Sequence, residues 1–201
     1  MTNLDLLRKQ LCRQRLNVPA ASREAASAAI AARIRHLDAF RQARHVAVYS
    51  AIRGEIDLQP LWHAELAAKH WYLPVIHPGS ERLMQFVRHE PAAILRRNRY
   101  GIPEPDTANA VVRDPRELDL VLTPLVAFDS SGNRVGMGAG YYDRAFSFIS
   151  VTAPPPRPKL IGIGYDFQHV EAIEPRPWDV PLWGVVTDEA VYGHLKEEGS
   201  N

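Results

Sequence analysis

The chain has 201 residues, 46% of them apolar, which is enough for one buried core and too few for two typical domains. We therefore expect a single domain over residues 1–201. Cys12 is the only cysteine, so an intramolecular disulfide and a structural Cys/His zinc site are excluded. Charges interrupt the N-terminus, and no segment approaches the roughly 20 apolar residues of a membrane span. These features predict a soluble, cytoplasmic protein with no membrane partner.

The formal net charge of +1 conceals an asymmetry. Residues 1–44 carry nine Lys and Arg against three Asp and Glu, or +6, which leaves −5 for the rest. Three interpretations are open: a solvated helix face packed on an acidic remainder, a nucleic-acid surface, and arginines that project towards a phosphate ligand. Because the segment has no recognition motif and no aromatic residue before Phe40, we do not expect a nucleic-acid partner.

Hydrophobic periodicity predicts alternating helices and strands. Two basic N-terminal helices are expected from apolar stripes, which are Leu4, Leu7 and Leu11 after the N-cap Asn3, and Ala26, Ile30, Ile34 and Leu37 after Ser22. The further elements are a strand at 46–50, a helix at 60–69, strands at 71–76 and 84–87, a loop-rich stretch at 88–117 with a short helix near 92–95, a strand at 118–123, a helix at 142–150, a stiff loop at 153–158, and strands at 159–165 and 184–187, the last in the chain. Such alternation favours an α/β fold with a mostly parallel sheet and helices on both faces.

The segment most typical of a ligand site is GNRVGMGAGYYDR, residues 132–144. Its glycines let the backbone approach an anion, and the following helix adds its N-terminal N–H groups. Arg134 and Arg144 can contact phosphate oxygens, and Asp143 is a hard ligand for the Mg²⁺ that accompanies a nucleoside triphosphate. The pattern is neither a P-loop nor a dinucleotide fingerprint, and an ordinary tight turn is the alternative interpretation.

Three further motifs accompany this glycine loop and cover nearly the whole chain. They are VAVYSAIRGEIDL (46–58), NRYGIPEP (98–105), and WDVPL with VVT (178–182 and 185–187). In this order the four motifs resemble those of the 5-formyltetrahydrofolate cyclo-ligase family, or methenyltetrahydrofolate synthetases. The uncharged Met137 and Ala139 are similar to the bacterial type.

The resemblance implies a Rossmann-like three-layer sandwich of the NagB/RpiA/CoA-transferase-like type, with residues 1–44 packed on the α/β core. It also implies a ligase that closes 5-formyltetrahydrofolate to 5,10-methenyltetrahydrofolate. ATP would be the co-substrate and Mg²⁺ the cofactor, the formyl oxygen would be phosphorylated, and ADP and phosphate would be released. We expect a monomer because no long apolar stripe is left outside the core.

The resemblance also carries roles to individual residues. The predicted catalytic residues are Arg134, Tyr141 and Asp143. The predicted ATP site comprises Arg8, Arg134, Val135, Gly136, Met137, Gly138, Ala139, Gly140, Tyr141 and Tyr142. The predicted folate site comprises Ser50, Glu55, Tyr100 and Tyr141, and the predicted magnesium ligands are Asp143 and Asp179, although from the residues alone Asp179 is typical of a turn. The chain departs from many relatives at Leu4 and Asp5, where a lysine precedes the arginine of the first helix.

Two other functions remain open. A similar α/β architecture serves sugar-phosphate isomerases and CoA-transferase-like enzymes, which need no ATP. A non-catalytic folate- or RNA-binding relative would instead use the basic N-terminal helices, with salt-sensitive polyanion binding and no product. The eight histidines show no metal-site spacing, and no G-x-S-x-G nucleophile motif is present.

Overall fold

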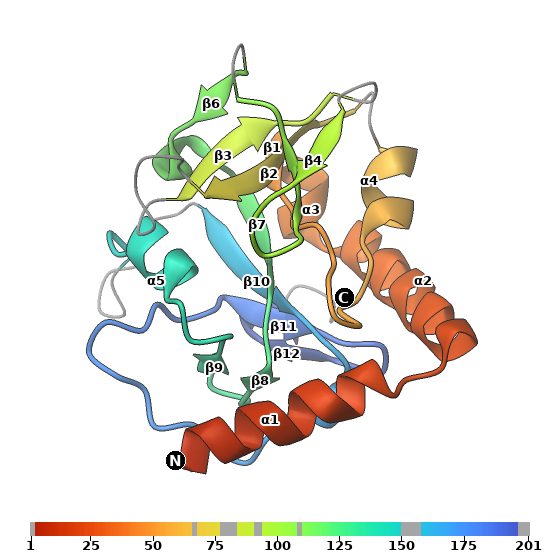
Figure 1. The fold of residues 1–201 in the computed structure, drawn as a ribbon, viewed down its shortest axis with the longest axis vertical. Helices are drawn as coiled ribbons and strands as arrows, with labels where there is room; N and C mark the ends of the chain where they lie inside the picture. Colours follow the sequence, from red (N-terminus) through yellow and green to blue (C-terminus); the bar gives the residue numbers. More distant parts are fainter. Residues whose placement is uncertain are drawn as a thin grey trace.

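Eight strands form a mixed sheet at the centre of the fold, in the order β12-β11-β10-β7-β1-β2-β3-β6 (Figure 1). This computed structural model describes residues 3–65, 68–76, 84–90, 94–107, 110–149 and 158–196. The strands of the sheet are β1 (His45–Ala47), β2 (His70–Ile76), β3 (Met84–Arg88), β6 (Val112–Arg113), β7 (Leu120–Pro124), β10 (Lys159–Ile163), β11 (Gly184–Val186) and β12 (Val191–Gly193). The strands from β11 to β2 run parallel, and β12, β3 and β6 pair antiparallel at the two sides. The predicted α/β fold with a mostly parallel sheet is confirmed.

Helices and two small hairpins surround this sheet. The α-helices of the described residues are α1 (Asn3–Leu16), α2 (Ala20–His36), α3 (Asp38–Gln42), α4 (Gln59–Ala64) and α5 (Tyr141–Ala145). The short 3-10 helices are η1 (Pro115–Glu117), η2 (Asp166–Gln168) and η3 (His194–Lys196), and the hairpins are β4 (Leu95–Arg97) with β5 (Pro103–Pro105) and β8 (Ala127–Phe128) with β9 (Arg134–Val135). None of these helices is long and apolar enough to cross a membrane.

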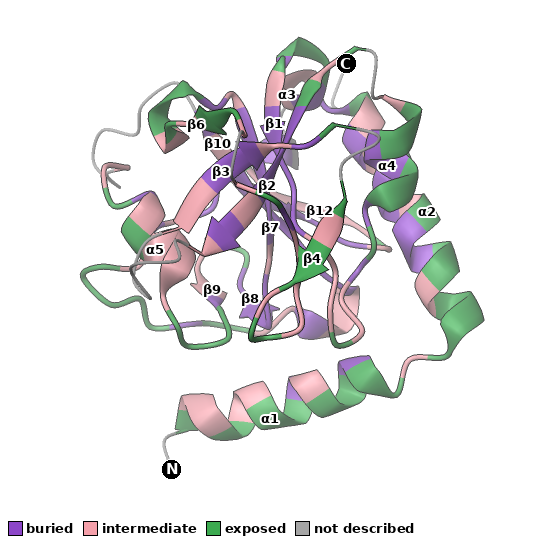
Figure 2. Cartoon of the chain, turned by 45° about the horizontal axis from the view of Figure 1, so that its top comes forward, coloured by how far each residue is buried: buried purple, intermediate pink, exposed green. Residues whose placement is uncertain are grey.

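Successive residues of the central strands pack in two different hydrophobic clusters. In β7, Leu120 and Leu122 belong to one cluster and Val121 to the other, because side chains alternate between the faces of a strand. The first cluster includes side chains of α2, α3 and α4, and the second includes Tyr142 and Ala145 of α5. The central strands are mainly purple in Figure 2. Burial on both faces explains why β7 is an almost continuous apolar run.

Helix α1 lies apart from these two clusters, beside the β8–β9 hairpin (Figure 1). Its Leu11 packs with Val126, Val135 and Ile173 in a third hydrophobic cluster. The outward side of α1 is exposed, as its green segments in Figure 2 show. Helix α1 is therefore anchored by one apolar stripe to the segments that follow β7.

Several predicted elements have slightly different bounds. Strands β2, β3 and β11 form within one residue of the prediction. Helix α2 begins at Ala20, directly after Pro19, and not after Ser22, which fits the preference for proline next to a helix start. Strand β7 begins at Leu120, because the Asp119 carboxylate accepts hydrogen bonds from the N–H groups of the chain that enters β1.

Other local predictions are wrong. The short helix expected near 92–95 conflicts with Leu95, which pairs with Pro105 in the β4–β5 hairpin, and residues 91–93 lie outside the described residues. Helix α5 ends at Ala145 because Phe146 turns into the core against Phe86. Helix α4 ends at Ala64, and β12 follows the strand expected to be the last. Ser150 and residues 153–157 of the predicted loop also lie outside the described residues.

Candidate functional site

A cavity of about 1180 Å³ lies at the carboxyl ends of β1, β2 and β7, where open α/β sheets bind ligands. Its walls come from α1, the loop after β1, the β4–β5 hairpin, the glycine loop with α5, and residues 173–180. Every residue predicted for the site lines this cavity: Arg8, Ser50, Glu55, Tyr100, Arg134, Val135, Gly136, Met137, Gly138, Ala139, Gly140, Tyr141, Tyr142, Asp143 and Asp179. The structure therefore brings together all of them, while their individual roles stay predictions.

The glycine loop leaves β9 and enters α5 through two left-handed backbone positions. Gly138 has φ +97° and Gly140, the N-cap of α5, has φ +64°, a region that favours glycine. A Cβ atom at Gly136 or Gly138 would meet no heavy atom within 4 Å. These two glycines are therefore not required by the packing of the fold itself, which leaves room beside the loop for a ligand. Helix α5 has only five residues, so the loop backbone matters more than the helix dipole expected from the sequence.

Arg134 connects two walls of the cavity, the glycine loop with α5 and residues 173–180. Its guanidinium forms an ion pair with Asp143 of α5 at 2.6 Å and donates a hydrogen bond to the Val180 carbonyl. The N–H group of Val180 in turn donates to Asp143 at 3.3 Å. The Arg134 side chain is only 6% exposed, and this burial lowers its pKa, whereas the charges of Asp143 and Asp179 oppose the shift. Arg134 is thus held by short contacts at the edge of the glycine loop.

The two predicted magnesium ligands both lie near Arg134 but have different partners. Asp143 uses Oδ1 for its contacts, and Asp179 accepts a hydrogen bond from the Arg176 N–H through Oδ2 at 2.9 Å. Within the described ranges, the second oxygen of each carboxylate has no hydrogen-bond partner, and no group of three or more His, Cys, Asp or Glu could hold a metal. This donor set fits Mg²⁺, which usually takes one or two carboxylates and completes its shell with water and phosphate oxygens.

Arg8 reaches the glycine loop from α1. Its Nε donates to the Gly136 carbonyl at 2.9 Å, and its Nη1 pairs with Asp5 at 3.0 Å. Asp5, which was named with Leu4 as a departure from the family's pattern, orients the arginine of the same helix. Arg144 also lines the cavity, with its guanidinium over the Tyr141 ring at 5.2 Å.

The loop after β1 and the β4–β5 hairpin form the opposite side of the cavity. Ser50 Oγ donates to the Pro103 carbonyl at 2.8 Å and ties the two segments together. Tyr100, at the tip of the hairpin, is 45% exposed. A side-chain hydrogen bond with Tyr100 raises the pKa of Tyr141, and both residues line the cavity. The side chain of Glu55 is largely buried, and this burial raises its pKa, whereas the charge of Arg15 opposes the rise.

The comparison with protein families agrees with these motifs. The 5-formyltetrahydrofolate cyclo-ligase family matches residues 2–188. The chain belongs to that family. A 5-formyltetrahydrofolate cyclo-ligase of Haemophilus influenzae is 35% identical over 190 residues, which cover 90% of this chain and 95% of the relative. One from Escherichia coli K12 is 40% identical over 154 residues, or 75% and 81% of the two chains. The predicted family is confirmed.

A solved structure extends the likeness to the whole fold of the cyclo-ligase family. The 5,10-methenyltetrahydrofolate synthetase of Aquifex aeolicus, solved by NMR, superposes with a TM-score of 0.82 at 30% identity. The superposition covers 100% of this chain and 96% of the relative. The superposition therefore includes the segments that line the cavity, which are the glycine loop, the loop after β1 and the basic first helix.

Arg15 is a residue of the site region that the sequence reasoning missed. It lies on α1 with its side chain only 2% exposed and contacts Glu55. The signal was present, because Arg15 continues the Leu4, Leu7 and Leu11 stripe at the next helical position. A charged side chain is almost never fully buried unless it is paired, so an arginine buried at this position requires a partner.

Proposed function

We propose that the cavity binds ATP and 5-formyltetrahydrofolate together and catalyses their reaction to 5,10-methenyltetrahydrofolate, ADP and phosphate. The observation that carries this proposal is the shared cavity. One wall presents the glycine loop with Arg8 and Arg134, and the opposite wall presents Ser50, Glu55 and Tyr100. A phosphate donor and its acceptor must meet in one space for direct transfer.

The reaction requires that the γ-phosphoryl group be aligned with the formyl oxygen and that the charge on the transferring group be stabilised. The formyl group is an amide, so its carbon is a weak electrophile and its oxygen a poor leaving group. We infer that the formyl oxygen attacks the γ-phosphorus of ATP, which breaks the bond to the bridging oxygen and releases ADP. The N10 amine then attacks the activated carbon, loses its proton, and the carbon–oxygen bond breaks to release phosphate. No covalent bond to the protein is needed.

The residues of the glycine loop supply what this transfer needs. The backbone from Gly136 to Gly140 would cradle the phosphates, and Arg134 and Arg8 would offset the charge on the transferring oxygens. Asp143 and Asp179 would hold Mg²⁺, which neutralises phosphate charge when bound. Because Arg134 is already paired with Asp143 and bound to Val180, its guanidinium needs little rearrangement to act.

The opposite wall would hold the folate. The Glu55 carboxylate accepts hydrogen bonds and suits the donor edge of a pterin ring. Tyr100 and Tyr141 would pack against the folate rings, and Ser50 would complete this side. Aromatic rings favour stacked or edge contacts with flat ligands.

We extend the proposal to the molecule as a whole. The chain would be one domain with a Rossmann-like three-layer sandwich of the NagB/RpiA/CoA-transferase-like type, acting as a cytoplasmic monomer. The central parallel strands, with helix side chains in the clusters on their two faces, support this architecture.

The test is the near-ultraviolet absorbance of methenyltetrahydrofolate when the protein is mixed with 5-formyltetrahydrofolate, Mg²⁺ and ATP. We expect a rise that is lost when ATP is omitted or when EDTA removes the metal. A rise without ATP would refute the phosphorylation route. No rise, together with salt-sensitive binding of RNA, would favour a non-catalytic binding protein instead.

A further inference from the structure

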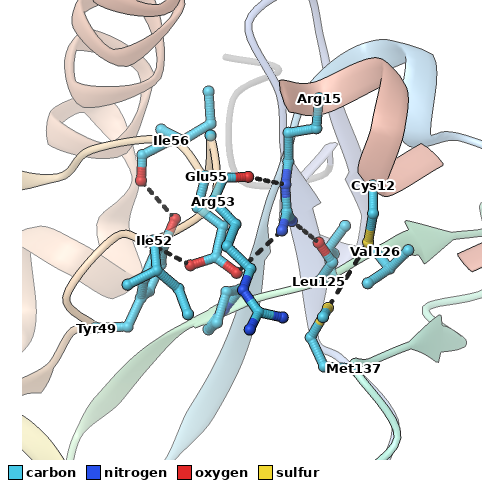
Figure 3. A network of polar contacts seen from close by, with 12 residues as sticks. Cys12, Arg15, Tyr49, Ile52, Arg53, Glu55, Ile56, Leu125, Val126 and Met137 are labelled. Atoms are coloured by element: carbon cyan, nitrogen blue, oxygen red, sulfur yellow. Dashed lines mark hydrogen bonds and ion pairs between the residues drawn. The ribbon is translucent and has the colours of Figure 1, made fainter. Parts of the chain in front are cut away.

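Arg15 of α1 makes three contacts with segments that surround the cavity (Figure 3). Its Nε donates to the Arg53 carbonyl at 3.1 Å, its Nη1 donates to the Leu125 carbonyl at 3.2 Å, and its Nη2 lies 3.4 Å from Oε1 of Glu55. Among the described residues, Nη2 is buried without a hydrogen-bond partner, so its only strong interaction is the charge of Glu55. The side chains of Arg15 and Glu55 are 2% and 8% exposed.

The turn that carries Glu55 is pressed against the same end of α1. Arg53 and Gly54 adopt positive φ angles of 50° and 75°, and the Glu55 N–H closes the turn on the Ile52 carbonyl. The Ile52 N–H donates to Oε2 of Glu55 at 3.1 Å. A Cβ atom on Gly54 would lie 2.7 Å from the Arg15 carbonyl oxygen. Both oxygens of the carboxylate are therefore held, one by the turn itself and one by α1.

We propose that Arg15 is a positioning residue that keeps the Glu55 carboxylate ionised and fixed in direction at the folate side of the cavity. This rests on the proposed function, because it takes Glu55 to be a folate-contacting residue. Arg15 has no place in the cavity lining, whereas Glu55 does, so Arg15 would act on folate only through Glu55. Helix α1 then serves both sides of the cavity, with Arg8 at the glycine loop and Arg15 behind Glu55.

The charges around Glu55 explain why it needs this partner. Burial disfavours the ionised carboxyl and raises its pKa, while Arg15 and, more weakly, Arg53 oppose the rise. From the other packed elements, the phenols of Tyr49 and Tyr142 face Glu55 and, being neutral, bring no compensating charge. Without Arg15, Glu55 takes up a proton at a higher pH and one of its oxygens becomes a donor.

The test compares Arg15→Met with Arg13→Met, an exposed arginine of the same helix. We expect Arg15→Met to raise KM for 5-formyltetrahydrofolate about tenfold, the loss of one charged contact. The kcat and the KM for ATP should stay within about twofold, and Arg13→Met should change none of the three by more than that. If Arg15→Met fails to fold, Arg15→Lys keeps the charge without the planar fork and should give a smaller rise in the folate KM.

Two further measurements separate positioning from general structure. In the Glu55→Gln background, Arg15→Met should add little to the folate KM, because the two residues act as one unit. Carbon-13 NMR of the Glu55 carboxyl, which needs no folate, should show a higher pKa in Arg15→Met than in the unmodified protein, and a smaller increase in Arg15→Lys.

The outcomes distinguish this inference from the proposed function. An unchanged Glu55 titration in Arg15→Met, or an equal rise in folate KM with and without Glu55 in either Arg15 variant, would overturn the positioning role. If the NMR shift occurs but the unmodified protein makes no methenyltetrahydrofolate, the proposed function fails while the ion pair is correct, and the folate role of Arg15 fails with it. A folate KM that is insensitive to Glu55→Gln in an active protein would refute the positioning role alone.

Discussion

Gly54 and Gly101 offer a matched test of how closely α1 packs on the Glu55 turn. Both glycines have almost the same left-handed backbone, with φ +75° and +77°. A Cβ on Gly54 would lie 2.7 Å from the Arg15 carbonyl oxygen, whereas a Cβ on Gly101 would have nothing within 4 Å. Alanine therefore introduces the same backbone strain at both sites, and a clash with a helix backbone at Gly54 alone.

These distances set the expected difference in the free energy of unfolding between Gly54→Ala and Gly101→Ala. The left-handed conformation costs an alanine about 1–2 kcal/mol at either position. At Gly54 the contact must also lengthen from 2.7 Å to the 3.4 Å of ordinary van der Waals contact, and forced repacking of this kind costs about 1–3 kcal/mol. Gly54→Ala should therefore be less stable than Gly101→Ala by about 2 kcal/mol, and melt about 4–8 °C lower.

Urea denaturation followed by circular dichroism gives the free energy of unfolding of both variants. Equal losses at the two positions would refute the close packing of α1 on this turn. Because Gly54 precedes Glu55, the folate KM should also rise in Gly54→Ala.

Three more predictions concern the cavity itself. Asp143→Asn should lower Mg²⁺-dependent turnover by about 100-fold or more. The melting temperature of this variant should fall by only about 2–4 °C, since the Asn side-chain oxygen can still accept a hydrogen bond from Arg134. Full activity would exclude Asp143 as a metal ligand. Gly136→Ala should change the free energy of unfolding by less than about 0.5 kcal/mol, because a Cβ at this position meets no atom within 4 Å. The same variant should raise the KM for ATP about tenfold in steady-state assays. An unchanged KM for ATP would show that the phosphates bind elsewhere. Burial raises the pKa of Glu55 above its ordinary value of 4.5, and only the ionised carboxylate accepts hydrogen bonds on both oxygens. Folate binding measured by calorimetry should therefore weaken on acidification while the pH is still above 4.5. Folate binding that stays unchanged down to pH 4.5 would contradict a role for the ionised Glu55.

Hydrophobic periodicity predicted the elements whose burial follows from the apolar pattern of their own residues. Strand β7 is apolar because both of its faces are covered, and that pattern can be read without knowing its neighbours. The glycine loop was equally predictable from the sequence, because Gly138 and Gly140 adopt a left-handed backbone conformation and lie beside charged residues. The helix expected near 92–95 is wrong at Leu95, because the pairing of Leu95 is decided by a distant partner, Pro105.

The candidate site was predictable from motifs, but its internal connections were not. All predicted residues line one cavity, yet nothing in the sequence joins Arg8 to the Gly136 carbonyl or Arg134 to the Val180 carbonyl. Such contacts depend on side-chain directions set by the assembled fold. Arg15 belongs to the basic N-terminal segment, yet its position on the apolar stripe already indicates that it is buried.

The most direct measurement uses 5-formyltetrahydrofolate with ¹⁸O in the formyl group. We predict that the phosphate released in the presence of ATP and Mg²⁺ carries one ¹⁸O atom per methenyltetrahydrofolate formed, since the formyl oxygen leaves on phosphorus. Unlabelled phosphate, with the ¹⁸O recovered in water, would contradict phosphorylation of the formyl oxygen.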